Sequence, residues 1–438
     1  MYITARLYPN ISVVEMEELV TPITSINGPV CFYKFTTTNV NMWSSFNVDH
    51  IRMPVFYFIG DVHYSKENGC LDNCIQIDRR TNVVTSSLNS ECIDLDTALH
   101  TWLLFNNIAG ITTDYFLEVP SQTLQHSTKS REDESDLQRG WLDSTTRLVR
   151  SCLLDNKNCL YGPNSRVHYT DIRQGRGDEY LSEVFSSAVL NKSSNATYQS
   201  LEEIYKYLSD NFDRIWQAYT EPESLHILLE MYQEIGKLAT TSPIRHLRLA
   251  LGSAYFDTSK TKTLVKSNGI TKSIRMYKAA WQLYKLSSRD VKGNDLANKL
   301  RAFVADNLKL LKTELEVNIT KLAEQTSVSG YLIKLERVNN AFINCGVLLM
   351  DIYTLSRALY YNNNVCIFHA GANHTRNYIV FARDYLGYRE VFGVDNVLEH
   401  IDEQTGTLSE IGREIVDRCI SSEELPLHLN FREMLERL

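Results

Sequence analysis

The chain lacks any long uninterrupted apolar run. Spanning a bilayer as a helix takes roughly 18 to 20 consecutive apolar residues, and no stretch of the sequence approaches that length. Its first residues carry Arg6, Glu15, Glu17 and Glu18 where a signal peptide would have its apolar core. We therefore expect a protein without a transmembrane segment and with a cytoplasmic location.

The chain also lacks an excess of positive charge. Its 45 lysines and arginines face 53 aspartates and glutamates, which gives a net charge of −8. A surface built throughout for nucleic acid needs concentrated Lys and Arg to neutralise phosphates, so that class is excluded. One segment is different, because seven basic residues in Lys260–Lys285 have no acidic residue among them. That segment is either a binding surface for an anionic partner or a solvated face.

Two common kinds of site are missing as well. No Gly-x-Ser-x-Gly sequence is present, so an acyl-serine route is not expected and water is the preferred nucleophile. The nine cysteines form an odd, dispersed set. Cys70, Cys74 and Cys92 suggest a zinc cluster, but no second cysteine pair or nearby histidine completes four ligands. Cys345 and Cys366 lie among apolar residues and are predicted to be ordinary buried thiols.

What the chain does have is a set of apolar runs that end in ionisable residues. The runs lie at 53–63, 114–120, 165–173 and 365–374. Their ionisable residues are Asp61, His63, Glu118, Asp171, Arg173 and His374. Ligands of open α/β sheets bind beyond the carboxyl ends of the strands, so we expect these six side chains to line one cleft. His369 precedes the glycine turn and is either a further residue of this cleft or a satisfied core histidine.

These residue types suit acid–base chemistry. With an ordinary pKa of about 6.5, His63 or His374 can take a proton from water near neutral pH. A carboxylate from Asp61, Glu118 or Asp171 would fix the tautomer of that histidine. Arg173 would stabilise a developing oxyanion or hold an anionic substrate. The same set could instead hold a divalent metal and lower the pKa of its bound water.

Several of these motifs resemble a known superfamily. Gly60-Asp-Val-His63, and Gly371-Ala-Asn-His374 with Leu386-Gly-Tyr388, resemble the motifs of the superfamily that contains erythromycin esterases, the ChaN haem-binding lipoproteins and the TraB/TIKI proteins. Glu118 resembles the family's second acidic strand end. The segment 166–173 is similar to uncharacterised proteins of large DNA viruses that share the fold. The matching segments cover about a quarter of the chain.

The resemblance implies a hydrolase that activates water against an ester or an amide. Erythromycin esterases are understood as histidine-base hydrolases, and TIKI proteins as metal-dependent proteases. It also implies a divalent metal (Mn, Co or Zn) on His63, Glu118 and His374, and a small-molecule or peptide substrate. The chain departs from the family at Asp61, where the family usually has glutamate.

That departure and the basic segment keep an alternative open. In it the protein is a catalytically idle member of the fold with a structural or binding role. It would then be a component of the virion or replication factory of a large DNA virus, with viral structural proteins as partners. Its location would be the virion or the cytoplasm of an infected host cell.

The pattern along the chain predicts the fold class. Short Val-, Ile- and Tyr-rich runs dominate up to about residue 120, and apolar residues at three- and four-residue spacing dominate 198–360. We predict an α/β fold with a mixed, mainly parallel sheet flanked by helices and a large helical insert before the last motif-bearing strand. The α/β domain would be discontinuous, made of 1–197 and 361–438, with 198–360 as the insert. The polar stretch 121–140 is predicted to be a loop, and the last fifty residues to form a closing helix.

Overall fold

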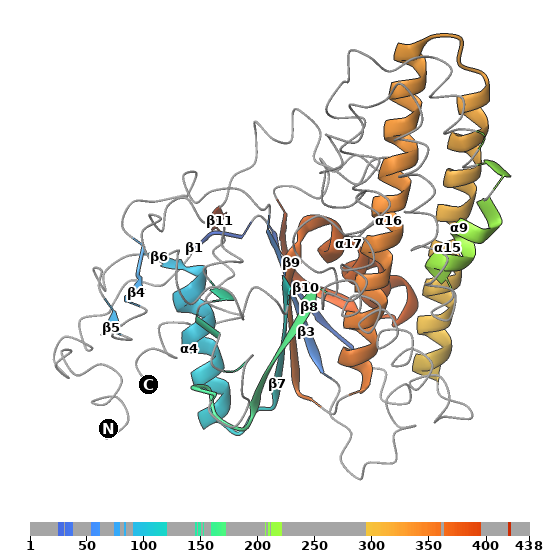
Figure 1. Ribbon diagram of the computed structural model, residues 1–438. Coiled ribbons are helices and arrows are strands. Elements are labelled where there is room, and N and C mark those ends of the chain that lie inside the picture. The colour runs from blue at the N-terminus through green and yellow to red at the C-terminus, as the bar shows by residue number, and fades with distance from the viewer. Residues whose placement is uncertain are drawn as a thin grey trace, which may run out of the picture.

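A six-stranded sheet with helices on both faces forms the centre of the computed structural model (Figure 1). The structure describes residues 25–29, 31–37, 54–61, 74–78, 83–84, 91–120, 145–146, 148–149, 152, 159–171, 206, 209–210, 212–220, 295–360, 363–395 and 419–421. The α/β class predicted from the sequence is confirmed. Among the described residues, no helix is both long enough and apolar enough to cross a membrane.

The sheet is mixed, with a parallel core. Its strands, in spatial order, are β10 (Arg389–Asp395), β2 (Cys31–Thr36), β3 (Val55–Asp61), β9 (Val365–Gly371), β7 (Thr113–Pro120) and β8 (Ser165–Asp171). The four strands from β3 to β8 run parallel, whereas β2 and β10 add antiparallel pairs at one edge. Small sheets are formed by β1 (Ser25–Asn27) with β6 (Cys92–Asp94) and β11 (Cys419–Ser421), and by β4 (Ile77–Asp78) with β5 (Val83–Val84).

The parallel strands are apolar on both faces, as expected for strands covered on both sides. On one face, the ring of Phe368 lies between those of Phe58 and Phe116, with centroids 5.1 and 5.2 Å away. On the other face, Tyr57 and Trp102 pack edge to face, 4.5 Å apart. Successive side chains of a strand alternate between the faces, so neighbouring residues of these strands belong to different layers wherever the register is regular.

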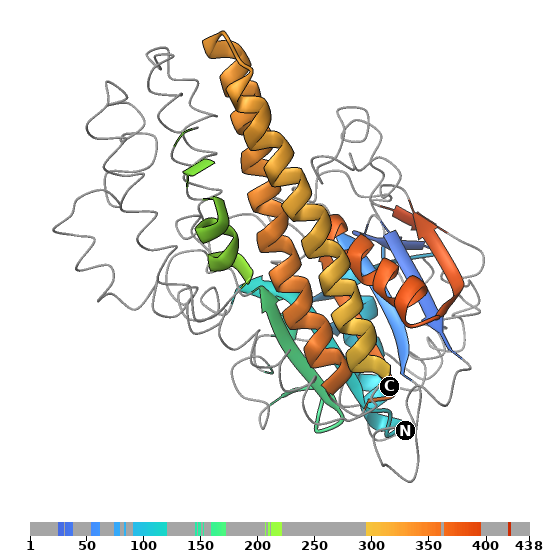
Figure 2. The same cartoon turned by 90° about the vertical axis from the view of Figure 1, so that its right-hand side faces the viewer.

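The helices form two layers. The helix α4 (Leu95–Ile108) covers one face, and α17 (Ala372–Val380), α15 (Asp295–Ala323) and α16 (Val328–Tyr360) lie on the other (Figure 1). A π-helical turn, Phe381–Tyr385, continues α17. The helices α15 and α16 form a long hairpin that extends past the sheet (Figure 2), and the short α9 (Phe212–Thr220) lies beside it.

The apolar stripes predicted in the hairpin are largely buried. Buried members are Leu300, Phe303, Val304, Leu315, Leu348, Ile352, Leu355 and Leu359. The hairpin follows β8 and precedes β9 in the chain, where the sequence predicts the helical insert. The domain boundaries themselves stay a prediction.

The sequence prediction is wrong in one respect. Arg389–Asp395 and Cys419–Ser421 are strands, so the last fifty residues do not form one closing helix. Cys74 and Cys92 are joined in a disulfide and are not available as thiolate ligands for zinc. A second disulfide joins Cys152 to Cys159, and Cys366 is a buried thiol, as predicted.

Candidate functional site

The carboxyl ends of β3 and β9 lie at a topological switch point. The next helix described after β3 is α4 on one face, whereas β9 leads directly into α17 on the other. Adjacent parallel strands whose connections leave on opposite faces open the crevice in which ligands of such sheets bind. Asp61 and Gly371 are register partners there. Gly371 is also the N-cap of α17.

Glu118 and His374 meet beside this crevice. Glu118, near the end of β7, accepts a hydrogen bond at Oε2 from the backbone N–H of Gly371, 2.6 Å away. Its Oε1 lies 3.5 Å from Nε2 of His374, in the first turn of α17. Both side chains are buried, with 5% and 3% of the residue exposed. The structure thus places these two residues of the predicted site next to each other.

A second carboxylate holds the other side of the imidazole. Oδ1 of Asp351, in α16, lies 2.7 Å from Nδ1 of His374. Oδ2 of the same carboxylate accepts a hydrogen bond from Nδ2 of Asn377, 2.6 Å away. When Asp351 is ionised, its carboxylate only accepts hydrogen bonds, so this contact then selects the Nδ1–H tautomer and leaves the lone pair at Nε2, on the side of Glu118. His374 is therefore bracketed by two carboxylates.

Burial sets the electrostatics of the site. Asp351 is fully buried, and the loss of hydration raises its pKa, while the positive charge of His374 and the hydrogen bonds from His374 and Asn377 oppose that rise. Burial also raises the pKa of Tyr378 well above its ordinary value, and nearby Asp351 adds to the rise. The Tyr378 ring stacks over the imidazole of His374 with centroids 6.3 Å apart. Tyr378 therefore stays a neutral phenol beside the pair.

Two other predicted site residues lie at the same edge of the sheet but belong to its other face. Gly60 approaches Thr375 of α17, so strand alternation turns Asp61 toward α4. Burial together with Asp96 and Tyr161 raises the pKa of Tyr115, a residue of the α4 face, and Asp61 adds to that rise.

Asp171 ends β8 and is turned toward α4 by the same alternation, since Arg166 and His168 meet Asp114 on the opposite face. Of the residues predicted to line one cleft, the structure therefore places Glu118 and His374 together on one face of the sheet. Asp61 and Asp171 border the same edge from the other face.

The histidine that precedes the glycine turn is a core residue. His369 is fully buried, and its Nδ1 lies 2.8 Å from the hydroxyl of Tyr115. This supports the core alternative for that residue.

Other predictions fall outside the described residues: His63, Arg173, the basic segment 260–285 and the polar stretch 121–140. They stay predictions.

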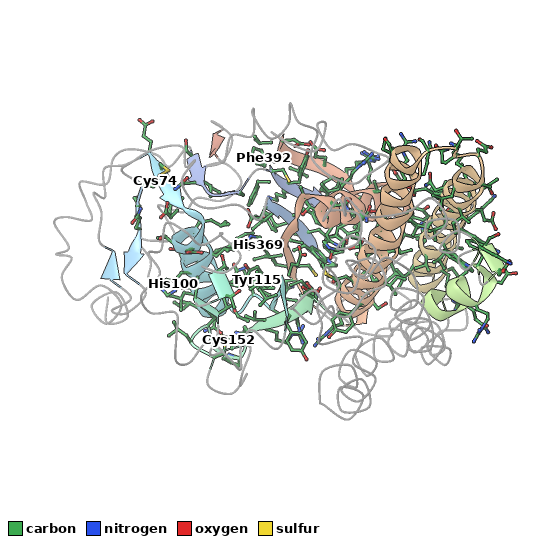
Figure 3. The ribbon with its side chains drawn as sticks, turned by 45° about the horizontal axis from the view of Figure 1, so that its top comes forward. Cys74, His100, Tyr115, Cys152, His369 and Phe392 are labelled. Carbon is green, nitrogen blue, oxygen red and sulfur yellow. A yellow bond between two sulfur atoms is a disulfide. The ribbon has the colours of Figure 1, made fainter. Side chains whose placement is uncertain are left out.

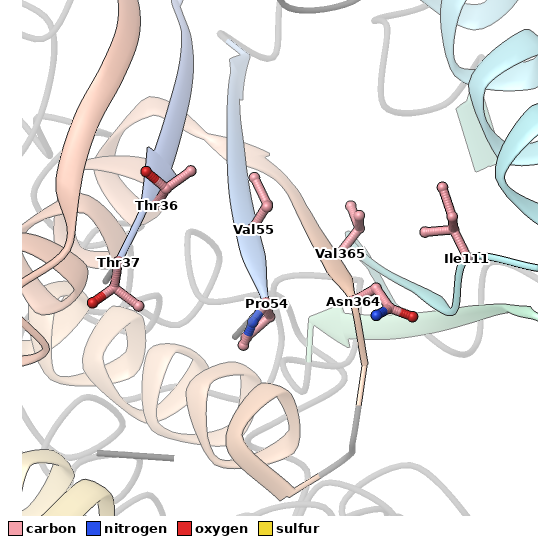
Figure 4. Close-up of a pocket in the computed structure, with 7 residues that line it drawn as sticks. All are labelled: Thr36, Thr37, Pro54, Val55, Ile111, Asn364 and Val365. Carbon is pink, nitrogen blue, oxygen red and sulfur yellow. The ribbon is translucent and has the colours of Figure 1, made fainter. Parts of the chain in front are cut away.

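A cavity of about 580 Å³ opens at the opposite, amino-terminal edge of the parallel strands (Figure 4). Its lining consists of Thr36, Thr37, Pro54, Val55, Ile111, Asn364 and Val365. Of these described residues none is ionisable, so this cavity does not suit acid–base chemistry. The candidate site stays at the carboxyl ends.

Asp351 and Asn377 are the site residues that the sequence reasoning missed. The signal for Asp351 is a single carboxylate within the apolar stretch 347–352 of a helix, because a charged residue among core positions is rarely buried unless it is paired. Asn377 follows His374 by three residues, on the same helical face. Comparisons with family models, with curated proteins and with solved structures find no match for this chain.

Proposed function

We propose that the protein is a hydrolase-like enzyme in which His374 activates water against an ester or amide bond. The observation that carries the proposal is the bracketing of one imidazole by Asp351 and Glu118 beside the crevice at the strand ends. A histidine oriented by a carboxylate at one nitrogen, with its other nitrogen directed at a reacting group, is the usual arrangement of a general base.

Each residue has a distinct part in this scheme. Asp351 fixes the ring and stabilises the positive charge that His374 acquires when Nε2 takes the proton of the attacking water. Glu118 faces the same nitrogen and can orient that water, or return the proton to the leaving group. The backbone N–H groups of the first turn of α17 carry partial positive charge, which favours a developing oxyanion near the helix start.

Glu118 and His374 also suit a divalent metal. Two ligands of a tetrahedral ion, each about 2.1 Å from it, are about 3.4 Å apart, and Oε1 of Glu118 and Nε2 of His374 are 3.5 Å apart. Among the described residues, no group of three metal-ligating side chains occurs, and the predicted third ligand, His63, lies outside them. A bound Mn, Co or Zn ion would supply a water of lowered pKa, with Asp351 orienting His374 through its second nitrogen.

One observation favours the alternative of an idle scaffold. Each of the three groups already has a structural role, since Glu118 holds the Gly371 amide, and Asp351 ties α16 to α17 through His374 and Asn377. All three side chains are almost completely buried. The same contacts would serve a protein whose role is purely structural or binding.

Substitution of His374 separates the two roles. The His374→Gln variant keeps a donor and an acceptor of similar size but not the base. On a panel of ester and amide substrates, in protein whose metal content has been measured, turnover should fall by about 10²–10⁴-fold. The matched control is His100→Gln, which changes a buried histidine on the other face of the sheet and should leave turnover intact. Equal turnover in wild type and His374→Gln, or none in the wild type on the whole panel, would support the scaffold.

A further inference from the structure

The two disulfides lie on the same face of the sheet, at opposite ends of α4. Figure 3 shows Cys74 and Cys152 on either side of His100, which lies within that helix. The described cysteines that remain thiols, Cys31 and Cys366, are buried. Cys31 is close to Gly60 on the face that α17 covers. Cross-links and thiols are thus divided between the two faces.

The first disulfide fastens the start of α4. Cys74 is linked to Cys92 in β6, which ends one residue before the helix begins. Next to the link, Ile75 donates a backbone hydrogen bond to Cys92 and accepts one from Asp94, at 2.8 and 3.0 Å. Asp94 is the N-cap of α4 but makes no capping hydrogen bond with its side chain. The cross-link therefore holds a helix start that has no side-chain cap.

The second disulfide fastens the end of α4. The link between Cys152 and Cys159 precedes a turn that packs on the last turn of the helix. In this turn, Asn164 donates to the backbone oxygen of Asn107 at 3.2 Å. Ser165 donates to the backbone oxygen of Leu103 at 3.3 Å.

Three polar contacts are buried on the side of the sheet that α4 covers. They pair Tyr115 with His369 at 2.8 Å, Thr145 with Asp96 at 2.8 Å, and Tyr161 with His100 at 3.2 Å. All six residues are buried. Hydrogen bonds of this kind are stronger in a dry, low-dielectric layer, and their groups are rehydrated once water enters. The layer is therefore sensitive to how firmly α4 is held.

We propose that the α4 layer is redox-sensitive: its two disulfides hold α4 closed over the sheet, and their reduction opens this layer while the α15–α16–α17 layer stays folded. In each reduction a dithiol gives two electrons and two protons to one S–S bond. That bond becomes two thiols, and the dithiol becomes a disulfide. Removing a cross-link restores conformational freedom to the loop that it closed. The closed form is then the form of an oxidising environment.

The test compares oxidised protein with protein treated with dithiothreitol under native conditions. Alkylation of unreduced, denatured protein followed by peptide mapping should find Cys74, Cys92, Cys152 and Cys159 unmodified. Hydrogen exchange measured by mass spectrometry should then accelerate on reduction by at least about tenfold in 95–108 and 113–119. Exchange in 341–359 of α16 should be unchanged.

Variants supply the matched control. The Cys74→Ser/Cys92→Ser and Cys152→Ser/Cys159→Ser proteins should each show faster exchange in α4 without reductant and a smaller response to it. The proposal is overturned if the four cysteines are alkylated without reduction. It is also overturned if reduction leaves α4 unchanged, or if α16 loses protection together with α4. The wild-type comparison decides the matter even if a variant does not fold.

Discussion

Acidification should destabilise the α4 layer through His100. This side chain is 1% exposed, its Nδ1 lies 3.2 Å from the hydroxyl of Tyr161, and burial lowers its pKa to about 4. In the unfolded chain the pKa returns to about 6.5. The unfolded chain therefore binds a proton at this histidine more tightly than the folded protein does. The stabilisation is complete above about pH 6.5 and is lost as the pH falls toward 4.

The size of the effect follows from the two pKa values. The pKa of His100 is about 4 in the folded protein and about 6.5 in the unfolded chain. The free energy of unfolding is therefore about 2 kcal/mol lower at pH 5 than at neutral pH. At pH 4 the loss grows to about 3 kcal/mol. Because stability is usually a small difference between large terms, such a loss is readily measured.

The assay is guanidinium unfolding at about pH 7.5 and about pH 5, followed by tryptophan fluorescence, for wild type and His100→Gln. Trp102, one of five tryptophans in the chain, lies in the same helix with its ring 4.5 Å from that of Tyr57, so part of the fluorescence signal reports on this layer. Glutamine can still contact Tyr161 but does not titrate. His168, whose pKa is also lowered by burial, titrates in both proteins and cancels. An equal loss of stability on acidification in both proteins would refute the reasoning.

Three further predictions concern buried contacts. Asp114 is fully buried and ionised, since the hydrogen bonds that it accepts outweigh the effect of burial and lower its pKa. Asp114→Asn should therefore lower the free energy of unfolding, measured with denaturant, by about 3 kcal/mol. A decrease below about 1 kcal/mol would contradict this prediction. Gly162 has a φ of +72°, and a Cβ there would collide with Asn107, so Gly162→Ala should lower stability by at least about 1 kcal/mol. A Cβ on Gly60 would collide with the sulfur of Cys31, so Gly60→Ala should destabilise the protein by about 1–3 kcal/mol. Adding Cys31→Ala to that variant should restore part of the lost stability. If the effects of the two substitutions are simply additive, the two residues do not interact.

Local patterns predicted the strands of the parallel core. Each of β3, β7, β8 and β9 combines an apolar run with a break at glycine, proline or charge, and the structure places their ends within three residues of the predicted bounds. The spatial order of these strands in the sheet could not be predicted from the local pattern, because strand pairing depends on contacts between distant segments. The position of β9 between β3 and β7 is an example.

The site was predictable only in part, for a related reason. Ionisable residues at strand ends pointed to Glu118 and His374, but Asp351 comes from a long helix whose docking on α17 no local signal specifies. The facing of Asp61 and Asp171 follows from strand alternation. The sequence alone does not say which helix covers which face of the sheet, so it does not say which helix the side chains of Asp61 and Asp171 are directed toward. The disulfides could not be predicted, since the pairing of dispersed cysteines depends on the fold.

The central position of β9 has a consequence for biosynthesis. The bond between Glu118 and Gly371 joins residues 253 apart in the chain, so translation at 5–20 residues per second needs on the order of 10–50 s to connect them. Throughout that interval β3 and β7 lack the strand that later pairs with both. Unpaired strand edges are templates for association with other chains. The nascent protein therefore passes through a period in which a chaperone that shields strand edges would raise its yield, and premature termination before β9 would leave an aggregation-prone product.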